Sequence, residues 1–219
     1  IGKKYSITRE RVRQVQNNSL QTLRDDAESE KLNAYLNILT NILTEHGKLM
    51  AEKHILPVAM KKLGMNPMVS SSGSEIKFLL NLGEDFKESK RTQEFNNFWY
   101  LDEGADKKAK DIVSKFVQKI IEINDPIKRE ELYKVLSRMV EEELGIKLSE
   151  NELKAILNLS RELKRNCLNL WGHQSWPEIN PRNSGDYAYL AMISEGKPLH
   201  FNDIPTVVLR NKINTKKLH

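Results

Sequence analysis

The hydrophobic and polar positions of the first 24 residues follow the period of an α-helix. Small and apolar side chains recur at i, i+3, i+7 and i+11 and predict a stripe that is buried: Val12, Val15, Ser19 and Leu23. The opposite side of the predicted helix is polar and offers directional hydrogen bonds: Glu10, Arg13, Gln14 and Asn17. Thr8 is the expected N-cap, and Glu10 falls in the first turn, where the helix dipole favours an anion.

Three later segments share another pattern: an amphipathic helix, a turn, a short apolar and basic stretch, and a second amphipathic helix. These segments are residues 36–63, 113–144 and 187–210. The turns fall at His46-Gly47, at Asn124-Asp125-Pro126 and at Glu195-Gly196. A spacing of about 75 residues indicates small domains and not the short units of a solenoid.

The first two of these segments continue alike. Residues 74–82 and 151–159 each predict a third helix with apolar positions at i, i+3 and i+4. A charged stretch follows each of them and leads to an aromatic, strand-like end at residues 95–100 and 168–171. Helix, short strand, helix, helix and β-hairpin form a winged helix. The expected fold is therefore mainly α, with tandem winged-helix domains and short β-wings behind a helix-turn-helix recognition helix.

Charge is distributed unevenly along the chain, and the net positive charge lies in the segment of the first predicted helix. Residues 1–24 contain six basic residues and one acidic residue, so this segment carries a net charge of +5, equal to that of the whole chain. Residues 25–219 contain 29 basic and 29 acidic residues and are neutral overall. A local basic patch is typical of a protein that binds a polyanion, although a solvated, charged helix end gives the same pattern.

The polar side of this helix has the chemistry that reads DNA in the major groove. Arg can fork to guanine, Gln can pair with adenine through two hydrogen bonds, and Glu can accept from cytosine. Flanking arginines bind phosphates and fix the register of the helix on the duplex.

The same residues carry a resemblance. The run T-R-E-R-V-R-Q-V, residues 8–15, resembles the recognition helix in region 4 of the sigma-70 family, and residues 19–24 keep most of its A-L-x-x-L-R ending. In that family the helix-turn-helix reads the upstream promoter hexamer. The resemblance implies base contacts by Arg9, Glu10 and Gln14 and backbone contacts by Arg11 and Arg13. The chain departs from the family at residues 16–18, and the first helix of the motif is expected upstream of residue 1.

A second resemblance lies near the other end. The run G-K-P-L-H-F-N-D-I, residues 196–204, is similar to the segment that opens HARE-type helix-turn-helix domains. Both resemblances together imply a bacterial, sigma-factor-like protein that is truncated on both sides. The expected domains are a truncated region 4 at 1–26, winged-helix domains at 30–103 and 106–180, and a truncated HARE-type domain at 182–219.

Composition adds the expected location. The chain is 39% hydrophobic and 30% charged with a pI of about 9.1, values typical of a globular protein. It contains no run approaching the ~20 apolar residues of a membrane span. A single cysteine, Cys167, excludes an internal disulfide and fits a reducing compartment. We expect a cytoplasmic, nucleoid-associated bacterial protein with no membrane partner.

Other residue types give no sign of catalysis. Three tryptophans are expected to pack in small cores and not to stack on nucleic acid: Trp99, Trp171 and Trp176. The five histidines lack the spacing of metal ligands, so neither a metal nor a cofactor is expected. Residues 70–73 predict a loop before a helix cap, and residues 141–143 a solvated acidic helix face. We therefore expect neither an enzyme nor a small-molecule substrate.

The leading hypothesis is a sigma-factor-like transcription initiation protein. It would bind double-stranded promoter DNA through residues 1–24 and contact the RNA polymerase core through the neutral winged-helix domains. One alternative is a repressor or activator that never joins polymerase as a sigma factor. Another is the DNA-recognition part of a restriction or modification protein.

Overall fold

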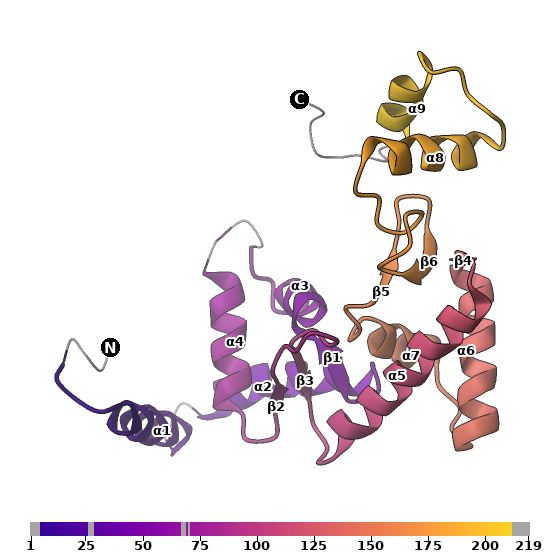
Figure 1. The fold of residues 1–219 in the computed structure, drawn as a ribbon. Helices are drawn as coiled ribbons and strands as arrows, with labels where there is room; N and C mark the ends of the chain where they lie inside the picture. The colour runs from indigo at the N-terminus through magenta and orange to yellow at the C-terminus, as the bar shows by residue number, and fades with distance from the viewer. Residues whose placement is uncertain (1–4, 26–28, 67–68, 70, 212–219) are drawn as a thin grey trace.

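The computed structural model describes residues 5–25, 29–66, 69 and 71–211. The fold is mainly helical and contains two small antiparallel sheets of three strands each (Figure 1). The helices are α1 (Arg9–Asp25), α2 (Ser29–Thr44), α3 (Glu52–Lys62), α4 (Ser72–Leu82), α5 (Ala105–Ile123), α6 (Arg129–Leu144), α7 (Glu150–Leu157), α8 (Ser184–Glu195) and α9 (Ile204–Arg210). The strands are β1 (Leu49–Ala51), β2 (Lys87–Ser89), β3 (Phe98–Tyr100), β4 (Ile127–Lys128), β5 (Leu163–Arg165) and β6 (Leu170–His173).

Two parts of the chain have the same element order. In the first repeat, α2 to β3, the sheet order is β1-β3-β2, and in the second repeat, α5 to β6, it is β4-β6-β5. Each central strand carries a tryptophan flanked by both neighbours. Trp99 lies opposite Met50 and Glu88, and Trp171 lies opposite Ile127 and Arg165. The predicted third helices and aromatic strands are confirmed, and β2 and β5 lie within the charged stretches that precede those strands.

The hydrophobic cores of the two repeats are joined. One cluster lies between α2, α3 and α4 and contains side chains with no exposed surface: Leu39, Ile42, Ile55, Ile76 and Leu80. The larger cluster is built on α5, α6 and α7. It also takes in four residues of the first repeat: Leu49, Ala51, Phe95 and Phe98. The first two repeats therefore pack as neighbours around a shared core.

Backbone hydrogen bonds close the joint between these repeats. Phe95 and Ser160 form an isolated antiparallel bridge. On either side of it, Asn96 N donates to Leu159 O at 2.8 Å, and Arg161 N donates to Glu94 O at 2.8 Å. The Asn96 side-chain amide also donates to the carbonyl oxygens of Asn158 and Ser160, each at 3.0 Å. The joint thus continues the hydrogen bonding of a sheet from one repeat into the other.

Helices α8 and α9 form a smaller unit at one end of the molecule (Figure 1). Its core contains Leu190, Ala191, Val207 and Val208. Asn183 caps α8 in a capping box with Asp186, and Gly196 ends the helix with a φ of 65°. No strand occurs between the two helices in the described stretch, residues 197–203. The last residues of the predicted HARE-type domain, 212–219, lie outside the described residues.

Several smaller predictions can be compared with the structure. Trp99 and Trp171 are buried, and Trp176 packs against the larger core, so the predicted packing role is confirmed. Residues 141–143 form an exposed acidic face of α6, as predicted. The prediction of a loop over residues 70–73 is wrong at its C-terminal end, because α4 already begins at Ser72, and that residue is buried. Among the described residues, no helix has the length and apolar character needed to span a membrane.

Candidate nucleic-acid interface

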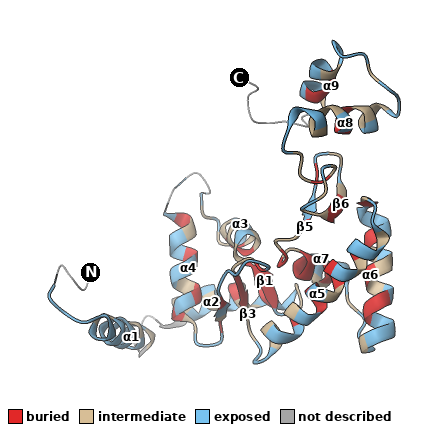
Figure 2. Ribbon diagram, in the orientation of Figure 1, coloured by how far each residue is buried: buried red, intermediate tan, exposed pale blue. Residues whose placement is uncertain are grey.

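Helix α1 projects from the body of the molecule beside α2 and α4, and most of its surface is exposed (Figure 2). Its start agrees with the sequence: the Thr8 hydroxyl accepts a hydrogen bond from the backbone N–H of Arg11 at 3.1 Å. This bond satisfies one of the free amides of the first turn. The helix therefore presents a well-defined N-terminal half, which holds all five predicted DNA-contacting residues.

Two of these residues form a forked ion pair. The guanidinium of Arg13 donates to both carboxylate oxygens of Glu10, at 2.6 and 2.9 Å. The pair lowers the pKa of Glu10, chiefly through these hydrogen bonds, and raises the pKa of Arg13. Both side chains are exposed, so DNA could compete for each of them. In the free protein, however, the carboxylate predicted to read a base is bound to the arginine predicted to bind phosphate.

The remaining predicted contacts lie on the same part of the helix. Arg11 Nη1 donates to Gln14 Oε1 at 3.5 Å, so these two side chains also lie together. Arg9 is exposed and has no hydrogen bond or ion pair from its side chain among the described residues. The structure therefore brings Glu10 to Arg13 and Arg11 to Gln14, and it leaves Arg9 open to solvent.

The apolar stripe of α1 is not buried, and that prediction is wrong. Val15 and Leu23 are 47% and 46% exposed, Ser19 is exposed and Val12 is only half-buried. The Ser19 hydroxyl instead donates to the Val15 carbonyl oxygen at 2.9 Å. The reason is physical: a periodic stripe is buried only when another element covers it, and no element of the described chain does so. A helix with this stripe open depends on outside contacts for much of its stability.

One basic side chain of α1 has a role that the sequence did not reveal. Arg24 reaches the carboxyl end of α4, where Nε donates to Leu82 O at 2.5 Å and Nη2 to Asn81 O at 3.4 Å. Its Nη1 also pairs with Glu84 at 3.2 Å. A cation at a helix C-terminus is favoured by the helix dipole and by free carbonyl groups. Arg24 thus anchors α1 to the first repeat and faces away from any ligand of the N-terminal half.

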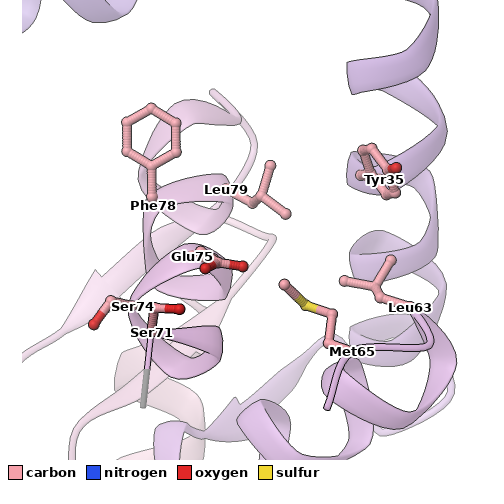
Figure 3. A pocket seen from close by; sticks show the side chains of 8 residues that line it. All are labelled: Tyr35, Leu63, Met65, Ser71, Ser74, Glu75, Phe78 and Leu79. Atoms are coloured by element: carbon pink, nitrogen blue, oxygen red, sulfur yellow. The ribbon is translucent and has the colours of Figure 1, made fainter. Parts of the chain in front are cut away.

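The third helices of the repeats do not offer a comparable polar and basic face. Lys77, the single cation of α4, is paired with Glu52 at 2.5 Å. Beside α4 lies an apolar hollow of about 450 Å³ (Figure 3). Its walls are Tyr35, Leu63, Met65, Ser71, Ser74, Glu75, Phe78 and Leu79. Such a surface suits contact with apolar groups better than contact with phosphates.

Helix α7 is less accessible still. Leu153, Ala155, Ile156 and Leu157 are all buried, which leaves little of this eight-residue helix open. It packs against both α5 and β1, so the two repeats enclose it. Among the helices considered, α1 alone combines exposure with a concentration of hydrogen-bonding and basic side chains.

The described residues hold no group of three or more His, Cys, Asp or Glu side chains placed to bind a metal ion. Burial raises the pKa of the Cys167 thiol, which is the opposite of what activates a cysteine nucleophile. Comparison of the chain with protein-family models, with curated proteins and with solved structures gave no match. The exposed residues of α1 and the surfaces of the repeats are therefore the features of the molecule that bear on its function.

Proposed function

We propose that this protein binds double-stranded promoter DNA through α1 and acts with the RNA polymerase core as a sigma-factor-like initiation protein. The observation that carries the proposal is the N-terminal half of α1, where Arg9, Arg11, Arg13 and Gln14 are exposed on a segment that holds the net positive charge of the chain. Cations and amides on an exposed helix are the groups that bind phosphates and read base edges. The similarity of residues 8–15 to sigma-70 region 4 supports the same assignment.

Within this proposal the two repeats are winged-helix domains that contact protein. Their shared order of helix, strand, helix, helix and two strands supports the winged-helix assignment. Their third helices favour a protein partner, because α4 borders an apolar hollow and α7 is enclosed. Because the same fold can bind either DNA or protein, the preference for a protein partner rests on the surfaces of α4 and α7.

The DNA assignment is tested by single substitutions in α1. A preferred duplex is first selected from a random-sequence library with the intact protein. We expect Arg9→Ala and Gln14→Ala each to weaken binding to that duplex by about 1–3 kcal/mol, the usual value of a good base contact. Gln16→Ala, an exposed amide on the same helix, serves as the matched control and should have little effect. Fluorescence anisotropy of the labelled duplex measures the affinity of the unaltered protein and of the three variants.

Deletion of residues 1–26 gives the decisive result. Unchanged affinity for the selected duplex would contradict the assignment of α1 as the DNA-binding element. A transcription assay with purified RNA polymerase core then separates the leading proposal from its alternative. Promoter-specific transcripts that depend on this protein support sigma-like function, whereas DNA binding without association with polymerase supports a repressor or activator.

A further inference from the structure

The hollow beside α4 is open and mostly apolar. Its volume of about 450 Å³ falls within the roughly 300–1,000 Å³ of typical binding pockets. Figure 3 shows Phe78 and Leu79 of α4 on one side of it and Tyr35, Leu63 and Met65 on the other. Phe78 and Tyr35 are each about half exposed, so the described part of the chain leaves their apolar surface uncovered. The hollow therefore has room for apolar side chains that come from elsewhere.

Glu75 is the single charged residue among the walls of the hollow. It is exposed, and its carboxylate has no hydrogen bond or ion pair among the described residues. Lys77, the one cation of the same helix, is already paired with Glu52. The hollow thus combines apolar walls with a free negative charge, and it favours an apolar partner that carries positive charge.

The stripe of α1 has both of these properties. Its members are Val12, Val15, Ser19 and Leu23, and of these Val15 and Leu23 are about half exposed. The stripe lies within residues 1–24, the segment with a net charge of +5. An exposed helix face is convex, whereas the surface beside α4 is hollowed, so the two surfaces match in shape as well as in charge and polarity.

The α1 helix of the same chain does not fill the hollow. Arg24 holds α1 at the carboxyl end of α4, through the carbonyl oxygens of Leu82 and Asn81, and Figure 1 shows α1 beside that end. Val15 accordingly stays exposed. Pairing of two α1 helices from different copies is disfavoured, because it would bring two segments of charge +5 together. The stripe of one copy and the hollow of another remain as the complementary pair.

We propose that two copies of this chain associate, with the apolar stripe of α1 from one copy seated in the hollow beside α4 of the other. The second copy then supplies the cover that α1 lacks within its own chain and stabilises that helix. The proposal rests on the protein-contacting role proposed for α4, and it names a second copy as the partner there. It does not rest on DNA binding, since Glu10 and Gln14 lie on the side of α1 opposite the stripe.

Sedimentation velocity of the intact chain over a range of concentrations measures this association. We expect weak, reversible dimers, because one helix face against one hollow is a small interface. Val15→Glu on the stripe and Phe78→Glu at the hollow should each raise the dissociation constant about tenfold or more, since either would bury an unpaired charge. Two control variants add the same charge elsewhere and should leave the dissociation constant unchanged: Asn17→Glu on the polar side of α1 and Tyr189→Glu, a half-exposed position of α8.

A mixture of the two weakened variants tests the pairing of the surfaces directly. Val15→Glu keeps an intact hollow and Phe78→Glu keeps an intact stripe, so the mixture should form a dimer that neither variant forms alone. Hydrogen exchange at the α1 amides of Phe78→Glu should slow when Val15→Glu is added, because the stripe of the former becomes covered. The proposal is wrong if the mixture forms no dimer, or if the unaltered protein stays monomeric at its highest soluble concentration.

Binding to purified RNA polymerase core separates this proposal from the proposed function. If the unaltered protein is monomeric and Phe78→Glu loses its affinity for the core, the hollow takes polymerase and not a second copy, and the proposed function stands. If the mixture dimerises as expected but the unaltered protein does not bind the core, the second-copy assignment holds and the proposed function fails.

Discussion

Helices α4 and α7 hold the same place in the two repeats but have opposite surroundings. In α4, Phe78 is 47% exposed beside an apolar hollow, whereas in α7 every apolar side chain is buried in the core that includes residues of both repeats. The element order is the same, so order alone does not decide which helix meets a partner. That property is set by what packs against the helix, and here the joint between the repeats covers one third helix and leaves the other open.

The largest expected difference between these helices concerns stability. Leu153→Ala in α7 removes a side chain that is 1% exposed and should lower the free energy of unfolding by about 2–5 kcal/mol. Phe78→Ala in α4 removes a half-exposed side chain and should change it by about 0.5 kcal/mol or less. Urea unfolding followed by circular dichroism measures both. Similar losses for the two variants would show that α4 is covered in solution.

A smaller effect is expected at the joint itself. Asn96→Ala removes two hydrogen bonds, to the carbonyl oxygens of Asn158 and Ser160, and should lower the free energy of unfolding by about 1–3 kcal/mol. Hydrogen exchange should rise at the amides that cross the joint, including that of Arg161. Asn81→Ala, whose side chain bonds only within α4, is the matched control. Equal exchange at the joint in both variants would argue against its role in holding the repeats together.

The contact between α1 and α4 should contribute less. Arg24→Ala removes the cation at the carboxyl end of α4, with an expected loss of about 1 kcal/mol. The main result should be faster proteolysis near α1 with little change in the melting temperature of the body. Arg11→Ala, a substitution on the same helix without that contact, provides the comparison. Equal protease sensitivity of the two variants would contradict the anchoring role of Arg24.

The smallest effect is a dependence of stability on pH through His54, a partly buried residue of α3. The folded protein lowers the pKa of His54, through burial and then through Lys53 and Lys154, while the Asn158 side chain opposes this shift. The unfolded chain therefore binds a proton more readily, and stability should fall as the pH drops below about 6.5, the ordinary histidine pKa. Denaturant midpoints measured across this range should fall less in His54→Asn. If the variant and the unaltered protein show the same dependence of stability on pH, His54 is not the source of that dependence.

The sequence predicted elements well where periodicity alone determines them. The third helices near residues 74–82 and 151–159, the aromatic central strands and the Thr8 cap all follow from local patterns that need no knowledge of distant neighbours. The burial of Val15 and Leu23 was predicted wrongly, because periodicity identifies a stripe but does not supply the element that covers it. The positions of the five predicted DNA-contacting residues on one exposed half-helix followed directly from their spacing.

Contacts between distant residues could not be predicted in this way. The anchor of Arg24 on Leu82 and the bridge from Phe95 to Ser160 join positions about 60 residues apart, and the bridge consists of backbone groups that no side-chain pattern encodes.

The bridge between Phe95 and Ser160 also constrains how the molecule can change through evolution. Its hydrogen bonds use main-chain atoms, so the surfaces on either side can be replaced residue by residue while the angle between the repeats stays the same. A partner that contacts both repeats must then have binding surfaces at the same fixed separation. The spacing of the two repeats would select such a partner. Insertions at the joint would therefore be tolerated far less than substitutions on the exposed surfaces of the repeats.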